Sequence, residues 1–301
     1  MRITVTGASG FIGRVLVPAL ASRGHAVRPL GREVLGDIAR NSDWAQSVAD
    51  TGAVVHLAAL AHRRGVGEAR LHAVNVNAPA ALGKAAAEAG IRLIFLSSVK
   101  ALGEETAGAP YVDSSPAAPR DAYGRVKADA ERSLRAIEGL KLTILRPPLV
   151  YGPGVKGNFL ALLRAVDRGW PLPLGSVRNR RSLIYVGNLV EAIVRCVEAP
   201  EAMGRTYLVS DSEPVSTPVL IRALARALGR PARLVPFPPG LLELAGSILG
   251  RGEAVKRLTR SLEVDDSAIR RELGWRPPYT FEEGLRLTAQ WFREEGSKRS
   301  R

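Results

Sequence analysis

The chain has 301 residues and is 46% hydrophobic, so it can bury a large core in one or two closely joined domains. No apolar run approaches the ~20 residues that a helix needs to cross a bilayer, and the N-terminus passes directly into a glycine-rich turn rather than a signal peptide. The formal net charge of +14 invites a nucleic-acid interpretation, but the basic residues are spread along the chain. Their main clusters, at 178–181 and 251–260, suit a diphosphate equally well, so we expect no nucleic-acid partner.

Short apolar runs alternate with helical patterns in the first half of the chain. We predict strands at 2–6, 26–30, 53–57, 91–96 and 141–145, and helices from a turn at 7–13 to residue 21, over 78–89, and from about 122 to 137. This alternation is typical of a Rossmann-type α/β fold, with a doubly wound parallel sheet covered by helices on both faces.

The pattern changes after Tyr151, where glycine and proline recur and helices later dominate. We therefore predict a dinucleotide-binding domain at 1–151, to which 182–209 returns by rejoining the main sheet. The remaining segments, 152–181 and 210–301, would form a smaller, mainly helical substrate lobe.

A glycine-rich turn connects the first predicted strand to the first predicted helix. Glycines at positions 7, 10 and 13 of TGASGFIG permit a tight turn and a close approach of the backbone to a pyrophosphate. The following helix N-terminus supplies N–H groups and a positive dipole. The segment predicts a dinucleotide site formed by Gly7, Ser9, Gly10, Phe11, Ile12 and Gly13.

The end of the second predicted strand bears on the choice between NAD and NADP. An acidic residue is expected there when the adenosine ribose is unphosphorylated, but residues 28–32 contain none. Arg32 is our candidate contact for a 2′-phosphate, which favours NADP over NAD while leaving both open. Asp37 and Ile38 are expected to close over the adenine.

Tyr123 and Lys127 stand four residues apart in a predicted helix and therefore share one face of it. A nearby ammonium is expected to lower the pKa of the phenol and to prepare it for proton transfer. Ser97 and Ser98 end the fourth predicted strand, at the sheet edge that faces the ligand crevice. A hydroxyl there can hydrogen-bond the reacting oxygen of a substrate.

At this point the chain resembles the extended short-chain dehydrogenase/reductase family, in its NAD(P)-dependent nucleotide-sugar epimerase/dehydratase branch, which includes UDP-glucose 4-epimerase. The matching segments, in chain order, are TGASGFIG at Thr6, HLAA at His56, NVNAP at Asn75, LSSVKALG at Leu96, YGRVK at Tyr123, LRPPLVYGPG at Leu145, GNF at Gly157, RRSLIYVGNL at Arg180 and RRELGW at Arg270.

The resemblance implies a role for each matching position. Ser98, Tyr123 and Lys127 would be catalytic, with Lys127 also binding the nicotinamide ribose. Leu57, Ala58 and Ala59 would flank the cofactor. The nucleotide-sugar would contact Asn158 and Arg181, with a second diphosphate cation from 256–260, for which we take Arg260. Lys100 would reach either the substrate or a surface carboxylate.

One departure from the family narrows the reaction. Sugar 4,6-dehydratases follow the catalytic hydroxyl with an Asp-Glu pair, whereas Ser98 is followed by Val99 and Lys100. This leaves redox chemistry at C4, as 4-epimerisation or as reduction of a 4-keto sugar. The segments SSVKALGE and GVKGNF most resemble bacterial polysaccharide-pathway members that reduce a UDP-4-keto-6-deoxy-N-acetylhexosamine. A non-catalytic cofactor sensor or assembly subunit is the alternative, but such proteins usually lose the tyrosine or the lysine.

The remaining features predict little further chemistry. We predict no metal site, because the histidines lack metal-ligand spacing with cysteine or clustered acids, and the one cysteine, Cys196, suits a cytoplasmic protein without a disulfide. The apolar residues between Leu241 and Ile248 are expected to be lobe core, with a dimer or membrane-surface face as the alternatives. The family resemblance also implies a possible homodimer.

Overall fold

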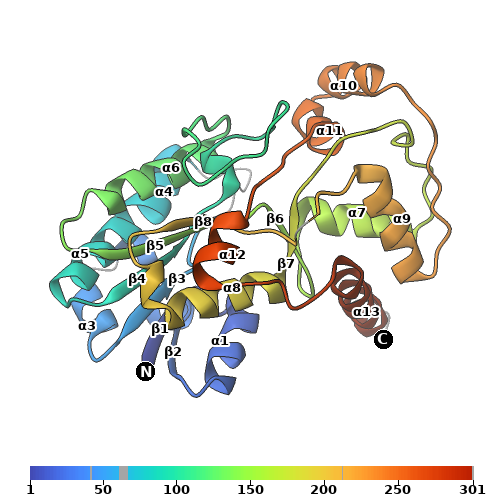
Figure 1. Cartoon of the computed structure of the whole chain (residues 1–301). Coiled ribbons are helices and arrows are strands. Elements are labelled where there is room, and N and C mark those ends of the chain that lie inside the picture. Colours follow the sequence, from blue (N-terminus) through green and yellow to red (C-terminus); the bar gives the residue numbers. More distant parts are fainter. Residues whose placement is uncertain (41–42, 61–66, 212, 300–301) are drawn as a thin grey trace.

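The computed structural model describes residues 1–40, 43–60, 67–211 and 213–299, in two lobes (Figure 1). The first lobe is built on a parallel sheet with the strand order β2-β1-β3-β4-β5-β8. Its strands are β1 (Arg2–Thr6), β2 (Ala26–Leu30), β3 (Ala53–His56), β4 (Arg92–Leu96), β5 (Lys141–Arg146) and β8 (Thr206–Leu208). The predicted Rossmann-type fold is therefore confirmed, and the five predicted strands agree with β1 to β5 within one residue at each end.

Successive residues of the strands point into two different cores, as the two-residue period of a strand requires. Ile94 faces the helices α1 (Gly13–Ser22), α8 (Val186–Glu198) and α12 (Ser267–Leu273). Phe95, the next residue, faces α3 (Trp44–Val48), α5 (Ala78–Glu88) and α6 (Ala122–Arg135). Both faces of the sheet are thus covered, which explains why its strands are almost wholly apolar.

Short elements connect these layers at the edge where the strands end. They are α2 (Arg32–Leu35), η1 (Ile38–Arg40), α4 (Glu68–His72), the π-helical turn η2 (Ala73–Asn77) and η3 (Val99–Ala101), whereas η4 (Pro200–Ala202) lies at the opposite edge, before β8. The carboxyl ends of parallel strands form the usual ligand crevice of such a sheet.

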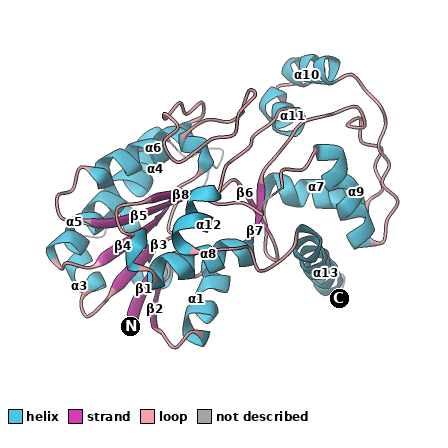
Figure 2. Cartoon of the chain, in the orientation of Figure 1, coloured by secondary structure: helices cyan, strands magenta, loops and turns pink. Residues whose placement is uncertain are grey.

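The second lobe is mainly helical, as Figure 2 shows by colour. It contains α7 (Gly157–Asp167), α9 (Thr217–Leu228), α10 (Pro239–Ile248), α11 (Gly252–Thr259) and α13 (Phe281–Arg299). Its core joins Phe159 and Leu163 of α7 to Leu224 of α9 and Leu285 of α13. Among the described residues, no helix combines the length and apolar character that crossing a membrane requires.

The return of the chain to the main sheet differs from the prediction in one respect. The strand β7 (Leu183–Tyr185) pairs with β6 (Leu149–Tyr151) in a separate two-stranded sheet. The strand that joins the main sheet is β8, beside β5, while α8 packs on the face of the sheet. Asp211 fixes this junction by accepting hydrogen bonds from the Tyr151 hydroxyl (2.8 Å) and the Asn188 side-chain amide (2.7 Å).

The expectation that residues 241–248 are lobe core is wrong. Leu241, Leu244 and Ile248 of α10 are exposed, and only Leu242 of its leucines packs against the lobe core. Figure 1 shows α10 at the outer end of this lobe, beyond α11.

Candidate active site

The glycine-rich turn between β1 and α1 is so tightly packed against neighbouring backbone atoms that two of its positions have no room for a side chain. Gly7 adopts a φ of 71° and lies against β3, so that a Cβ added there would stand 2.7 Å from the Ala58 nitrogen. A Cβ at Gly13 would stand 2.5 Å from the Ala8 carbonyl oxygen. Both positions therefore require glycine, and Gly10 closes the turn by donating its N–H to the Gly7 carbonyl at 2.9 Å.

The turn presents the N-terminus of α1 to the crevice without a blocking side chain. Its N-cap, Ile12, makes no side-chain cap, and the first helical turn contains no acid, so its N–H groups and dipole suit an anion. Ser9 is exposed at the tip, whereas Phe11 and Ile12 pack towards the second lobe. Leu57 and Ala58 follow β3 beside the turn, where Leu57 donates its N–H to Thr6, and Ala59 is exposed. The residues present therefore fit a dinucleotide.

The residues predicted to contact the adenosine, Arg32, Asp37 and Ile38, differ in their exposure and in their partners. Arg32 is exposed at the start of α2, whereas Asp37 accepts two hydrogen bonds from Arg70, at 2.5 and 2.7 Å. The Arg70 guanidinium lowers the pKa of Asp37. Ile38 is half-buried beside Asp37.

Glu33 is a residue that the sequence interpretation missed. Its carboxylate folds back over Gly31, so closely that a Cβ at Gly31 would overlap it. An acid therefore lies at the end of β2 after all, one residue beyond the range in which it was sought. Its signal was the glycine itself, which leaves room for the carboxylate.

Ser98 and Tyr123 belong to two elements that pack directly on each other. Ser98 caps η3 by accepting a hydrogen bond from the Lys100 N–H (3.3 Å), and Tyr123 lies in the first turn of α6. These elements meet at Gly124, where a Cβ would overlap the Lys100 carbonyl oxygen. The start of α6 is fixed by Asp121, whose side chain accepts the Gly124 N–H at 2.7 Å.

Lys127 is buried behind this pair, with 3% of its surface exposed. Its Nζ donates a 2.8 Å hydrogen bond to the Leu96 carbonyl and lies 4.7 Å from the centre of the Phe95 ring. The distance from Nζ to the centre of the Tyr123 ring is 5.9 Å. Burial lowers the pKa of Lys127 to about 8, although the Glu131 charge opposes this shift.

The expected acidification of the phenol is not found. Burial raises the pKa of Tyr123 to about 12, and the negative charge of Asp121 adds to the shift. The Lys127 ammonium does not overcome these effects, because it bonds to Leu96 and lies over Phe95. Tyr123 is therefore a neutral phenol at physiological pH, able to donate a proton.

A second set of residues, also missed in the sequence, supports α6 from behind. Glu131, one turn after Lys127, is 4% exposed and accepts two hydrogen bonds from Arg146, at 3.0 and 2.6 Å. It also accepts a 2.5 Å hydrogen bond from the Ser97 hydroxyl. These contacts connect α6 to the ends of β4 and β5 and satisfy a buried carboxylate.

Lys100 lies between two carboxylates. Its Nζ is 2.5 Å from both Glu104 and Asp121, and Arg257 approaches the same two acids at 3.5 and 3.6 Å. Burial alone would raise the pKa of Asp121, but hydrogen bonds from Lys100 and Gly124 outweigh it and lower the value to about 2. Asp121 is therefore ionised, and the cluster bridges the two lobes through Arg257 of α11.

Arg181 and Arg260 occupy different environments near this bridge. Arg181 donates to the Arg260 carbonyl at 3.0 Å, and burial, with the charge of Arg257, lowers its pKa to about 10. The Arg260 guanidinium instead pairs with Glu105 (2.5 Å) and Glu243 (3.0 Å). Arg257 is thus the member of 256–260 whose charge acts on Arg181, a partner that the sequence left unresolved. Asn158 is exposed in the first turn of α7.

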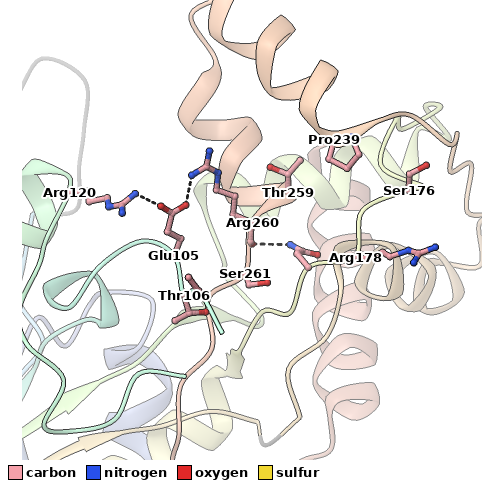
Figure 3. A pocket seen from close by; sticks show the side chains of 11 residues that line it. Glu105, Thr106, Arg120, Ser176, Arg178, Pro239, Thr259, Arg260 and Ser261 are labelled. Carbon is pink, nitrogen blue, oxygen red and sulfur yellow. Dashed lines mark hydrogen bonds and ion pairs between the residues drawn. The ribbon is translucent and has the colours of Figure 1, made fainter. Parts of the chain in front are cut away.

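A pocket of about 670 Å³ opens between the lobes beside Arg260 (Figure 3). Its wall includes Glu105, Arg120, Arg178, Pro239 and Arg260. Figure 3 shows Glu105 between Arg120 and Arg260, so this acid is neutralised from both sides. Ser98, Tyr123 and Lys127 do not line this pocket, so it is separate from the candidate reaction centre.

The histidines and acids of the described ranges give no sign of a metal centre. No group of three or more His, Cys, Asp or Glu residues in the described part of the chain is arranged to hold a metal ion. His56 is buried, shares a 2.8 Å hydrogen bond with Thr6 and stacks on Phe95. Burial lowers its pKa to about 3, so it remains neutral.

Comparison with known families identifies the chain. The model of the NAD dependent epimerase/dehydratase family matches residues 3–210. The chain belongs to this family of enzymes. The family model therefore covers the main sheet, the glycine-rich turn and the elements that carry Ser98, Tyr123 and Lys127.

Other members of the epimerase/dehydratase family match over almost their whole length. A UDP-glucose 4-epimerase of Vibrio cholerae is 40% identical over 318 residues, which cover 98% of this chain and 97% of that protein. The N-acetyl-alpha-D-glucosaminyl-diphospho-ditrans,octacis-undecaprenol 4-epimerase of Escherichia coli O157:H7 is 28% identical, with 96% and 94% covered. The second lobe is therefore shared as well as the first.

Solved structures of the family have the same fold. MoeE5 in complex with UDP-glucuronic acid and NAD is 25% identical and has a TM-score of 0.78, covering 98% of this chain and 100% of its own. UDP-N-acetylglucosamine 4-epimerase from Bacillus cereus has a TM-score of 0.79 at 19% identity, with 97% and 99% covered. At that identity the second likeness shows only a shared fold.

Proposed function

We propose that this enzyme catalyses redox chemistry at C4 of a UDP-linked sugar and acts as a 4-epimerase. The observation that supports the proposal is the packing of α6 against η3, which brings together the elements that carry Tyr123 and Ser98 at the carboxyl edge of the sheet. The 40% identity to a UDP-glucose 4-epimerase supports both the substrate class and the reaction. Such an enzyme supplies sugars for surface polysaccharides.

The reaction needs one group to move a proton and another to hold the reacting oxygen. Tyr123, as the phenolate, takes the proton of the C4 hydroxyl when C4 is oxidised and, as the phenol, returns it when the ketone is reduced, while Ser98 donates a hydrogen bond to the same oxygen. Lys127 binds a ribose hydroxyl and supplies positive charge next to the phenol when a proton leaves it. A dinucleotide held by the glycine-rich turn would supply the acceptor and donor of the C4 hydride, and its positive nicotinamide, together with Lys127, would stabilise the phenolate. Epimerisation further requires the keto sugar to present its other face before the hydride returns.

We propose NAD as the cofactor, held by the glycine-rich turn and by the loop at 57–59. Glu33 supports this choice, because a carboxylate at the end of β2 accepts hydrogen bonds from a ribose 2′-hydroxyl and repels a 2′-phosphate. The sequence preference for NADP depended on the absence of such an acid. Calorimetric titration should show tighter binding of NADH than NADPH, and Glu33→Gln should narrow the difference by about tenfold. Equal affinities in the unaltered enzyme would contradict this assignment.

The diphosphate of the substrate is assigned to Arg181 and Arg257. Their guanidinium groups share the region between the lobes, and bidentate arginine–phosphate geometry suits a diphosphate. Arg260 is a weaker candidate because Glu105 and Glu243 already neutralise it. We propose that the segments 152–181 and 210–301 form the substrate lobe, with Asn158 as a further contact. Lys100 would reach the sugar only by leaving its two carboxylates.

Dehydration is disfavoured by the residues after Ser98. Val99 is buried and Lys100 is an ammonium held by Glu104 and Asp121, so neither can act as the Asp-Glu pair of a 4,6-dehydratase. We therefore expect no loss of water from C5 and C6.

The test is a turnover assay combined with analysis of the cofactor that remains on the enzyme. Purified protein should interconvert the C4 epimers of a UDP-hexose, with UDP-glucose and UDP-N-acetylglucosamine as the first substrates to compare. Denatured protein should release NAD, because an epimerase keeps its cofactor between the two half-reactions. Stoichiometric consumption of NADPH by a UDP-4-keto sugar, without interconversion of epimers, would instead identify a 4-ketoreductase.

A second candidate substrate is a sugar joined to a polyprenyl diphosphate. The E. coli relative is named for a substrate of this class, and both substrate types present a sugar on a diphosphate. The observation that favours it here is the position of α10, whose first residue, Pro239, lines the pocket while Leu241 and Leu244 are exposed. The same epimerisation assay with a polyprenyl-diphosphate sugar in detergent tests it.

A further inference from the structure

The outer face of α10 is an uninterrupted apolar stripe. Leu241, Leu244, Ala245 and Ile248 stand at the i, i+3, i+4 and i+7 positions of one helix and are all exposed. Leu244 is 59% exposed, Ile248 78% and Leu249, which follows the helix, 73%. We call these five residues the apolar stripe.

The opposite face of α10 holds the helix firmly on the lobe. Gly246 is buried against α11, where a Cβ would stand 2.6 Å from a methyl carbon of Val255. Glu243 accepts hydrogen bonds from Arg260 (3.0 Å) and from the Thr259 hydroxyl (2.6 Å). The other face of α10 is therefore held by α11, and the apolar stripe is the face of this α10–α11 hairpin that remains exposed.

The surroundings of the stripe are basic. The segment 239–260 contains four basic and two acidic residues in a chain with a net charge of +14. Both acids are occupied, Glu243 by Arg260 and Glu253 by Lys256. Arg251, which follows Leu249 just after the C-terminal end of α10, is exposed and has no ion pair within the described ranges. Exposed apolar side chains next to an exposed basic residue complement a lipid surface, which has negatively charged headgroups above an apolar interior.

The hairpin that carries the stripe also lines the pocket between the lobes. Pro239 starts α10 and lines the 670 Å³ pocket, and Thr259 and Arg260, at the end of α11, line it too. The α10–α11 hairpin is thus one wall of that pocket, with the stripe on its outer side. A flat surface bound to the stripe would lie next to the pocket.

We propose that the α10–α11 hairpin docks on the surface of an anionic lipid membrane. The apolar stripe enters the boundary between headgroups and acyl chains, and Arg251 contacts the lipid phosphates. Docking in this way brings the pocket to the membrane surface, where a sugar on a lipid diphosphate is available. The inference goes beyond the proposed reaction, and its test does not depend on turnover.

The experiment is co-sedimentation of the full-length protein with phosphatidylcholine vesicles that contain or lack phosphatidylglycerol. The unaltered protein should sediment with the anionic vesicles and remain in solution with the neutral ones, and high salt should weaken the binding. The double variant Leu244→Gln/Ile248→Gln should bind at least about tenfold more weakly, because two large apolar side chains are lost from the interface.

The matched control is Met203→Gln/Val219→Gln, which removes two exposed apolar side chains outside the hairpin. Met203 follows η4, and Val219 lies in α9. This control should bind vesicles as tightly as the unaltered protein. Both variants should keep their activity on a soluble UDP-sugar. The activity assay therefore tests the proposed reaction, and the sedimentation tests membrane docking independently of it.

Three results would overturn the proposal. The first is a protein that stays in solution with anionic vesicles. The second is equal vesicle binding by Leu244→Gln/Ile248→Gln and its control. The third is a stable dimer, seen in sedimentation velocity, that the stripe variant dissociates while vesicle binding is absent, since the stripe would then be covered by a second copy of the chain.

Discussion

The helices α6 and α10 make opposite uses of their apolar residues. α6 buries Val126, Ala130 and Leu134 against the sheet, and Asp121 caps its start. α10 has no side-chain cap and turns its stripe to the outside. α6 is the more polar of the two in sequence, yet it is the one that is embedded.

The difference teaches that partners, rather than composition, decide which helix is fixed. Lys127 and Glu131 of α6 are buried because the Leu96 carbonyl, Ser97 and Arg146 satisfy them. Leu241 and Leu244 of α10 stay exposed, because the residues of this helix that pack against α11 and the lobe core are Gly246 and Leu242. α6 therefore positions chemistry, whereas α10 is available for a surface outside the chain.

The largest effect on activity is expected from removing the phenolic hydroxyl of Tyr123 in α6. Tyr123→Phe should lower kcat by about 10²–10⁴-fold, because the proton at the C4 oxygen loses its acceptor and donor. NADH affinity and the unfolding midpoint should change little, since the ring still packs. Near-normal turnover of this variant would show that proton transfer has been assigned to the wrong group.

Next in size is the loss of support behind α6. Glu131→Gln leaves the Arg146 guanidinium without a charge partner in a buried site, so the free energy of unfolding should fall by about 3–5 kcal/mol. Denaturant unfolding measures the change, and Glu138→Gln, on the exposed segment after the same helix, is the control. Equal stabilities of the two variants would mean that the cluster contributes nothing to holding α6.

A pair of glycine substitutions compares the two helices directly. Gly124→Ala places a Cβ on the Lys100 carbonyl oxygen and must push α6 away from η3, so kcat should fall by about 10²-fold. Gly240→Ala in α10 meets no atom within 4 Å and should leave kcat unchanged. If both variants have the same activity, the contact between α6 and η3 does not control the geometry of the site.

The smallest effect is a pH dependence set by Lys127. Its protonated form, which stabilises the phenolate, is lost as the pH rises through about 8, so kcat/KM should fall above that value because Tyr123, with a pKa of about 12, then loses its proton less readily. Unfolding is not the cause, because a lysine whose pKa is lowered from 10.5 to about 8 makes the fold more stable as the pH rises between these values. A flat profile from pH 7 to about 9.5 would contradict this role.

The fold was predictable because it depends on local patterns. The alternation of strand and helix and the glycines at 7, 10 and 13 were sufficient to place β1 to β5, α1, α5 and α6. The strand β8 was harder, because three residues carry too little periodicity to show which sheet they join. For the same reason β7 was assigned to the wrong sheet.

The site was predictable in its positions but not in its electrostatics. Spacing placed Tyr123 and Lys127 on one face of α6, but the pKa of the phenol depends on burial and on Asp121, which no pattern reveals. The roles of Glu33 and Glu131 likewise depend on where the chain folds back, as do the different partners of Arg257 and Arg260. Long-range contacts of this kind require coordinates.

The most direct test of hydride transfer at C4 uses a UDP-hexose that carries deuterium at that carbon. The enzyme should convert it to the epimer with the deuterium still at C4, because the hydride moves to the nicotinamide and back without meeting water. Hydrogen from the solvent at C4 of the product would contradict the account, since it would mean that C4 is deprotonated and reprotonated instead.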